Sequence, residues 1–140
     1  LDEIQNKLGT RAKIGLLATT GTVQTGIYGD KAKAMGLPMF VPDDMHQERV
    51  MAAIYGPQGA KAGYTNGICR EDLISAAEYL VKTHGCNCLI LGCTELPLIL
   101  DESDDFEVAG SRVIVVDPTA ALARKVVKTA EDAYAATGIR

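Results

Sequence analysis

The sequence predicts an α/β domain in which helices cover both faces of a sheet of about four parallel strands. Four short runs are almost entirely apolar, at 14–18, 39–41, 88–91 and 113–116. None shows the polar alternation of a sheet with one wet face, which favours parallel strands covered on both sides. Longer segments with helical spacing separate the runs. This alternation of strand and helix predicts a three-layer αβα architecture.

The first three helices after the opening strand are predicted from spacing and from end signals. One helix is expected at 23–35, directly after the first strand, and another at 45–55, after the start signal Pro42-Asp43-Asp44. The third carries an apolar stripe over residues 73–81 and stops at Thr83-His84-Gly85. Each lies between two predicted strands, as crossover helices of a parallel sheet do.

The end of the chain holds one more helix and one charged segment. Asp117-Pro118-Thr119 is a helix start signal, and an apolar stripe follows at Leu122, Val126, Ala130 and Ala133. Asp117 and Thr119 are therefore expected to cap this helix, although a role at a site is also open to them. The acidic segment 101–107 is expected to be a solvated loop.

Composition limits the classes of partner. The 140 residues suffice for one domain, and the net charge of −4 comes from interspersed charges of both signs. Nothing in this pattern indicates a nucleic acid or a membrane as partner, and there is no apolar run of membrane-spanning length. The four cysteines are expected to be free thiols in a reducing, cytoplasmic environment, because a core of this size needs no disulfides.

The start of the chain suggests that the sequence is a piece of a longer protein. Leu1 is not a methionine, and it opens a segment that reads as a helix, with Ile4 and Leu8 four residues apart and Gly9 at the end. We therefore expect residues 1–12 to be a linking helix from a preceding domain. Residues 13–140 are expected to be the carboxyl-terminal α/β domain.

Cys93 follows a buried strand and Gly92, in the run Leu89-Ile90-Leu91-Gly92-Cys93-Thr94-Glu95-Leu96-Pro97. Ligands of open α/β sheets bind at the carboxyl ends of strands, which is where this thiol would lie. Thr94 is expected to cap a new helix with Glu95 and Pro97 in its first turn, and a helix start lowers the pKa of a thiol. The alternative is a small buried core cysteine.

Two further segments could contact a ligand. The turn Thr19-Thr20-Gly21-Thr22 follows the first strand, and its backbone amides and hydroxyls could seat a carboxylate, or Thr19 could simply cap a helix. Lys61 lies in a loop of small residues, where a lysine is usually only solubilising. No phosphate-binding glycine motif is present, and Cys88 and Cys93 lie too far apart along an extended strand to share a metal ion with Cys86.

Three strings resemble the aspartate/glutamate racemase family, and its aspartate racemase branch in particular. They are GCTELP at 92–97, GLLATTGTVQTGIY at 15–28 and KAG at 61–63, with Thr25 where the family usually has Ser. The resemblance implies a two-domain racemase without cofactor or metal, in which one cysteine thiolate removes the α-proton and a second thiol protonates the opposite face. Cys93 would be one of the two. Thr19, Gly21, Thr22, Lys61 and Thr94 would surround the amino-acid or dicarboxylate substrate.

The sequence departs from the family's pattern in two further respects, one in the missing first half and one in this half. The first-half C-N-T-x-H segment is absent, since Cys86-Asn87-Cys88 precedes a strand, and Leu122 stands where many relatives have a histidine. His46 and His84 suit helix ends. We therefore expect the carboxyl-terminal half of a racemase, inactive alone. It is expected to associate with itself through apolar surface around Leu96–Leu98 and residues 1–8. A single-cysteine decarboxylase or isomerase of small diacids, and a non-catalytic binding module, remain alternatives.

Overall fold

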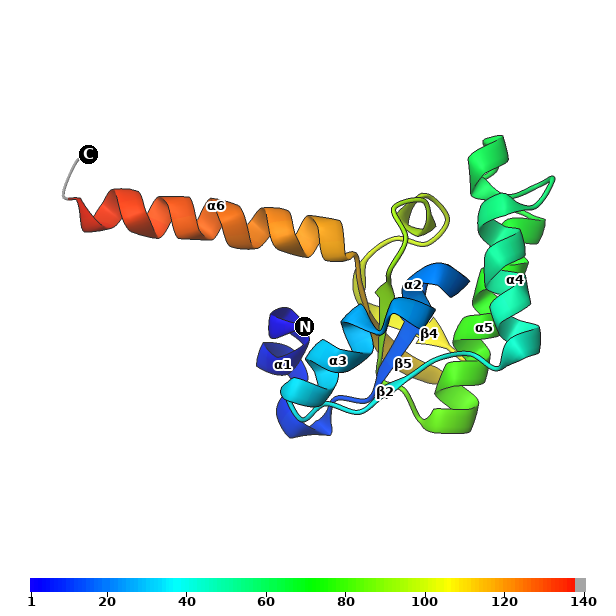
Figure 1. Cartoon of the computed structure of the whole chain (residues 1–140), viewed down its shortest axis with the longest axis horizontal. Helices are drawn as coiled ribbons and strands as arrows, with labels where there is room; N and C mark the ends of the chain where they lie inside the picture. Colours follow the sequence, from blue (N-terminus) through cyan, green and yellow to red (C-terminus); the bar gives the residue numbers. More distant parts are fainter. Residues whose placement is uncertain (138–140) are drawn as a thin grey trace.

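A computed structural model of the chain describes residues 1–137 and shows one mixed five-stranded sheet with helices on both faces (Figure 1). The strand order is β2-β1-β3-β5-β4. The first four of these strands are parallel, and β4 is antiparallel to β5. The strands span Ile14–Leu17 (β1), Met39–Phe40 (β2), Cys88–Leu91 (β3), Ser103–Val108 (β4) and Ser111–Val116 (β5). The four predicted parallel strands are thereby confirmed.

Six α-helices and three short 3-10 helices connect and cover the strands within the described residues. The α-helices span Asp2–Leu8 (α1), Thr20–Thr25 (α2), Ile27–Ala34 (α3), Asp44–Tyr55 (α4), Ile68–His84 (α5) and Pro118–Ala136 (α6). The 3-10 helices span Gly9–Arg11 (η1), Ala60–Ala62 (η2) and Leu96–Leu98 (η3). None of the helices in residues 1–137 has both the length and the hydropathy needed to cross a membrane.

Two apolar clusters, one on each face of the sheet, form the core. Along β1, Ile14 and Leu16 join the cluster that contains Ile4 of α1 and Ala32 of α3. The next residue, Leu17, points the other way and joins Val50 of α4 and Leu73 of α5. Because successive strand residues are buried on opposite faces, the domain has the three layers that the sequence predicts.

The acidic segment 101–107 was expected to be a loop, and this expectation is wrong. Residues 103–108 form β4, which pairs with β5 across a turn in which Ala109 and Gly110 both have positive φ angles, 53° and 75°. Such a turn suits the twist of a hairpin. Asp104 and Asp105 are exposed while Val108 is buried. Charged residues on an edge strand are compatible with pairing on one side only, which explains why composition alone suggested a loop.

The predicted single helix at 23–35 is instead two helices, α2 and α3, with the break at Gly26. Gly26 has a φ of +70°, and it ends α2 while its carbonyl accepts the amide of Asp30 in α3. This left-handed conformation suits glycine, which has no Cβ to clash. The apolar spacing continues across the break, so periodicity did not reveal it.

The amino-terminal residues belong to the core of this domain. Ile4 is fully buried and Leu1 and Leu8 are partly buried against the same cluster. On the other side, Leu96 is fully buried while Leu98 is 59% exposed. The apolar surface expected around Leu96–Leu98 and along residues 1–8 is therefore small, because Leu98 is the one apolar side chain of these two segments that is exposed.

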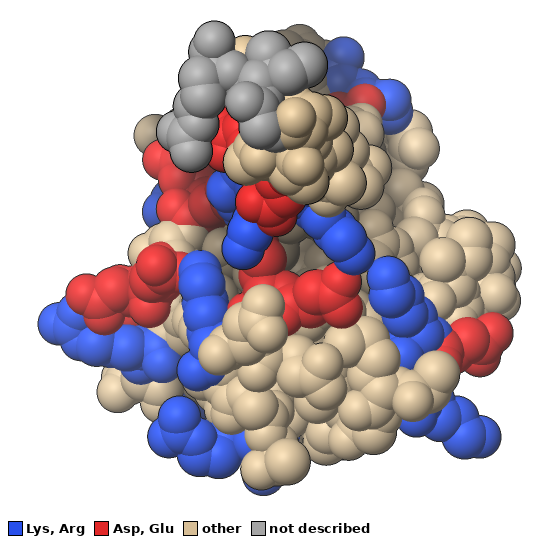
Figure 2. Space-filling model, turned by 90° about the vertical axis from the view of Figure 1, so that its left-hand side faces the viewer, with Lys and Arg blue, Asp and Glu red and all other residues tan. Residues whose placement is uncertain are grey.

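Some of the exposed large apolar side chains lie on α6, which extends away from the body of the molecule (Figure 1), and the others are spread over the rest of the described chain. None of its 19 residues is buried, and Leu122, Val126, Val127 and Tyr134 are all more than half exposed. Its first turns are tied down by ion pairs of Arg124 with Glu3 and Glu102. Acidic and basic side chains interleave on this end of the molecule (Figure 2). Such exposed pairs contribute little to stability.

One pair of identical substitutions tests this division between core and projecting helix. Val50→Ala in α4 removes two fully buried methyl groups and should lower the free energy of unfolding by about 2 kcal/mol. Val126→Ala in α6 removes a side chain that is 59% exposed and should change it by less than about 0.5 kcal/mol. Urea unfolding measures both, at a protein concentration low enough for light scattering to show a monomer. Under that condition, a loss of 1 kcal/mol or more from Val126→Ala would show that α6 packs on the body.

Candidate active site

The carboxyl ends of three adjacent parallel strands meet at one edge of the sheet. Residues Thr19, Cys93 and Asp117 follow β1, β3 and β5 there. The amide of Gly92 donates to the carbonyl of Leu17 over 2.7 Å, which holds the ends of β1 and β3 together. A Cβ at Gly92 would lie 3.0 Å from the Cβ of Ala18, so glycine permits this close approach just before the cysteine.

Cys93 is the one partly exposed thiol of the four; Cys69, Cys86 and Cys88 are buried. Its Sγ donates a hydrogen bond of 2.9 Å to Oε2 of Glu95. The hydroxyl of Thr94 donates to the same oxygen, also over 2.9 Å. Cys93 is thus a partly exposed thiol next to a carboxylate; it packs against the core cluster but is not fully buried, unlike the other three cysteines.

Lys61 reaches the same carboxylate from a different part of the chain. Its Nζ lies 2.6 Å from Oε1 of Glu95 and 5.5 Å from the centroid of the Tyr55 ring. Lys61 lies in η2, whose preceding residue, Gly59, approaches the end of α4 so closely that a Cβ would lie 2.8 Å from the carbonyl oxygen of Ala52. The structure therefore brings the predicted Cys93, Thr94 and Lys61 together, through Glu95.

Hydrogen bonds and, for Cys93, burial set the ionisation of this cluster. Donation from Cys93, Lys61 and Thr94 lowers the pKa of Glu95 from its ordinary 4.5 to about 2. The hydrogen bond to Glu95 raises the pKa of Lys61. Burial and the hydrogen bond to Glu95 raise the pKa of the Cys93 thiol. At neutral pH the site therefore contains a thiol, a carboxylate and an ammonium group.

The expectation that a helix start lowers the pKa of Cys93 is wrong. Thr94 caps no α-helix, because only the three-residue η3 follows and its start has no side-chain cap. The Thr94 hydroxyl is instead bonded to Glu95. A negative carboxylate therefore stands next to the sulfur where the sequence suggested the positive end of a helix dipole.

The turn after β1 is bonded internally. The hydroxyl of Thr19 accepts the amide of Thr22 over 3.2 Å and so caps α2, and it also donates to the Thr22 hydroxyl over 3.0 Å. A Cβ at Gly21 would meet only the Thr19 hydroxyl oxygen, 4.0 Å away, so the backbone there faces open space. The capping role of Thr19 is thus confirmed, and a ligand role for Thr19, Gly21 and Thr22 stays a prediction.

The remaining predicted positions have structural roles. Asp117 accepts the amide of Thr119 over 3.0 Å and caps α6, while Leu122 is 62% exposed. His46 stacks on Tyr79, and the His84 ring stacks on Phe40, both in the layer of α4 and α5. Within residues 1–137, no three acidic, cysteine or histidine side chains are grouped so that they could hold a metal ion.

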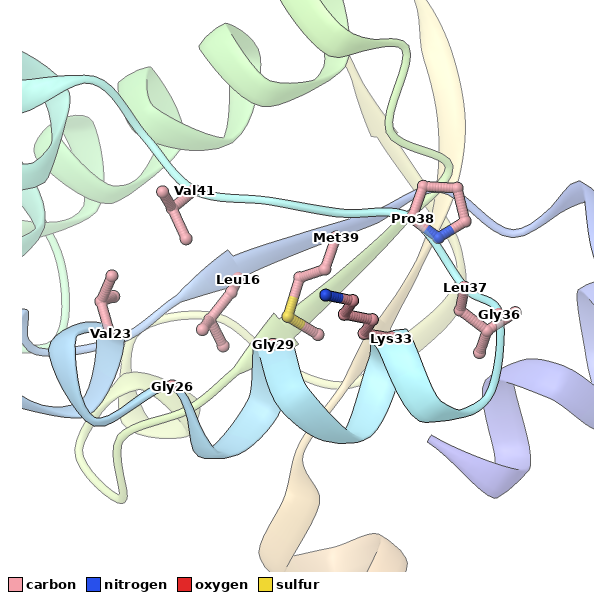
Figure 3. A pocket seen from close by; sticks show the side chains of 10 residues that line it. All are labelled: Leu16, Val23, Gly26, Gly29, Lys33, Gly36, Leu37, Pro38, Met39 and Val41. Carbon is pink, nitrogen blue, oxygen red and sulfur yellow. The ribbon is translucent and has the colours of Figure 1, made fainter.

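One cavity of the described residues is separate from this cluster. It measures about 430 Å³ and lies between α3 and β2, at the sheet edge (Figure 3). Its lining residues are Leu16, Val23, Gly26, Gly29, Lys33, Gly36, Leu37, Pro38, Met39 and Val41, among which none of the predicted site residues occurs. Cys93, which is partly exposed, and Lys61, whose side chain is 45% exposed, do not line this cavity.

Comparison with known proteins agrees with this geometry. The sequence profile of the Asp/Glu/hydantoin racemase family matches residues 2–126. The chain belongs to this family. The resemblance of the three sequence motifs is thus confirmed at the family level. Among the relatives, a glutamate racemase of Desulforudis audaxviator is 30% identical over 120 residues, which are 84% of this chain and 40% of that protein. An uncharacterised protein of Pectobacterium carotovorum is 38% identical over 122 residues, covering 87% of this chain and 75% of that one.

Solved racemase structures have the same fold. An aspartate racemase homologue from Pyrococcus horikoshii superimposes with a TM-score of 0.74 at 28% identity, over 93% of this chain and 52% of that chain. The aspartate racemase of Picrophilus torridus gives a TM-score of 0.64 at 28% identity, over 92% of this chain and 49% of that chain. The chain therefore spans about half the length of these two racemase structures.

Sequence reasoning missed the central residue of the site, Glu95, which it assigned to a helical first turn. The available signal was a carboxylate two residues after a cysteine, within the motif that identifies this racemase family. Gln47 was also missed: its Nε2 donates to the carbonyl of Ala18 over 2.8 Å, next to the turn after β1. No local pattern indicates this contact, because it joins residues 29 positions apart.

The thiols of the native chain should react with iodoacetamide in the order of their exposure. Cys93 should be alkylated first, and its rate should still rise above pH 9.0, because its pKa is raised and the thiolate is the reacting form. Cys86 and Cys88, with pKa values of about 11 and about 12, should react only on unfolding. Peptide mass spectrometry over a pH series measures the order. Labelling of Cys86 or Cys69 before Cys93 would contradict it.

Proposed function

We propose that the protein to which this chain belongs is a cofactor-independent racemase of an aspartate-type amino acid, with Cys93 as one of two cysteines that act as acid and base. The observation that carries the proposal is the cluster of an accessible thiol, a carboxylate and an ammonium group at the strand edge of a racemase-family fold. Proton transfer at a carbon requires a donor or acceptor within hydrogen-bond reach of the reacting atom, and an exposed Cys93 can serve as one.

In this proposal Lys61 binds a carboxylate of the substrate. The Lys61 side chain is 45% exposed, so an incoming anion can reach its ammonium group, and this group already donates a hydrogen bond to the carboxylate of Glu95. Thr19, Gly21, Thr22 and Thr94 supply amides and hydroxyls nearby. The α-proton next to an ionised carboxylate is very weakly acidic, and positive charge and hydrogen-bond donors at that carboxylate stabilise the carbanion-like state. No metal or organic cofactor is assigned a role.

The second acid–base group is proposed to come from a preceding domain. Inversion at carbon requires a group on each face of the substrate, and Cys93 is the one thiol of the four that is not buried. The chain spans about half of the solved racemase structures, which leaves room for such a domain. We propose that the isolated chain cannot racemise, and that the protein works in a reducing cytoplasm with its four thiols free.

The single thiol at the site also supports a second candidate. A relative with one cysteine would decarboxylate or isomerise a small diacid and would need no second thiol. The two candidates differ in whether the preceding domain contributes a cysteine opposite Cys93, so the sequence ahead of Leu1 separates them. A non-catalytic binding module is the third candidate, and it predicts ligand binding with no exchange of the α-proton even in the longer protein.

The uncovered α6 is the basis for proposing a macromolecular partner. Four large apolar side chains on one projecting helix are more exposed surface than a soluble monomer usually leaves bare. We propose that the preceding domain covers α6 in the longer protein. In the isolated chain, a second copy of the chain would take that place, which gives a homo-oligomer.

Exchange of the α-proton in deuterium oxide tests the proposed function. By NMR, the 140-residue chain should leave the α-protons of L- and D-aspartate unexchanged, whereas the longer protein should exchange both. In the longer protein Cys93→Ser should abolish exchange and Cys69→Ser, a change at a buried thiol, should preserve it. Light scattering of the same 140-residue chain should give a molar mass above the 14.9 kDa of the monomer.

Two outcomes would contradict the proposal. Enzymatic exchange by the isolated chain would show that one domain suffices. Undiminished exchange of the α-proton by the Cys93→Ser protein would show that Cys93 takes no part in the reaction.

A further inference from the structure

The hydrogen bond between Cys93 and Glu95 determines which of the two side chains carries the shared proton. An ionised carboxylate has no hydrogen to donate, so a contact of 2.9 Å from Sγ to Oε2 requires the hydrogen to be on sulfur. If the thiol were ionised, two negative groups would face one another at that distance. The alternative, a protonated Glu95 next to a thiolate, is disfavoured because Lys61 and Thr94 both donate to this carboxyl group.

Lys61 does not compensate the sulfur directly. The charged groups that act on Cys93 are Glu95 and Lys61, from the β3–η3 turn and from η2. The ammonium group of Lys61 lies on Oε1, the carboxylate oxygen that Cys93 does not use. Its positive charge is therefore neutralised mainly by Glu95, and the carboxylate is the nearest charge to the thiol.

We propose that Glu95 is a positioning residue that keeps Cys93 in its thiol form in the empty site, so that Cys93 enters the reaction as the proton donor. This inference rests on the proposed racemase function. In the step that it implies, a base on the opposite face, from the preceding domain, takes the α-hydrogen. The S–H bond of Cys93 then breaks, and its proton forms the new C–H bond. After the step Cys93 is a thiolate and the opposite base is protonated, so the total number of protons is unchanged.

Lys61 links the hydrogen bond between Glu95 and Cys93 to substrate binding. When a substrate carboxylate binds the ammonium group of Lys61, Glu95 loses a hydrogen-bond donor and its proton affinity rises. Glu95 then holds the S–H hydrogen bond more strongly. The thiol thereby stays protonated until the carbanion-like centre forms on the face turned towards Cys93.

Alkylation of Cys93 by iodoacetamide at pH 7.5 tests the inference on the 140-residue chain. Glu95→Gln keeps the shape of the side chain but removes its charge, so the thiolate fraction should rise and Cys93 should react at least about threefold faster. Lys61→Met removes the opposing positive charge and should slow the reaction by about threefold or more. The opposite signs separate an electrostatic role from a simple change in exposure, which would accelerate both variants.

A matched ion pair elsewhere supplies the controls. Glu78→Gln and Lys82→Met change the same charges in the exposed pair on α5 and should leave the Cys93 rate within experimental error. Thermal melting confirms that each variant is folded. An unchanged or slower rate in folded Glu95→Gln would overturn the inference. Because this measurement needs no substrate, a failed α-proton exchange in the longer protein would refute the racemase function and leave the assignment of Glu95 standing.

Discussion

The Glu95 carboxylate accepts hydrogen bonds from the Cys93 thiol, the Thr94 hydroxyl and the Lys61 ammonium group. These donors come from two separate parts of the chain, the turn after β3 and the η2 loop that follows α4. With the carboxylate in place, a cysteine and a lysine 32 positions apart in sequence become one site. Their charges depend on one another, since each donor lowers the basicity of Glu95 and Glu95 in turn raises the pKa of Cys93 and Lys61.

The sheet supplies the rigid frame for this cluster, and the cluster itself stays open. Parallel pairing of β1 with β3 and the close approach at Gly92 bring Cys93 to the strand edge next to the turn of Thr19. A cavity of about 430 Å³ lies elsewhere, between α3 and β2. The partly exposed Cys93 and the uncovered α6 support the proposal that this domain shares its site with another one, and the chain spans about half the length of the two solved structures.

Residues with strong local signals were predicted correctly, and residues whose roles depend on distant contacts were not. The four parallel strands follow from continuous apolar runs, and Cys93 follows from its place after Gly92. The hairpin strand β4 was missed because its exposed charges resemble a loop, and the break at Gly26 because periodicity continues across it. The raised pKa of Cys93 could not be predicted, because it depends on the burial of the thiol in the folded chain and on the direction in which the Glu95 side chain points.

Titration of the Glu95 carboxyl carbon, followed by NMR, tests whether this carboxylate joins Cys93 to Lys61. The folded-state pKa lies below the unfolded value, so the ionised cluster stabilises the fold above pH 4.5, and this contribution is lost as the pH falls towards 2. The titration midpoint of Glu95 should be about 2 in the wild-type chain and higher in Lys61→Met. A midpoint near the ordinary 4.5 in the folded wild-type chain would show that Glu95 does not join Cys93 to Lys61.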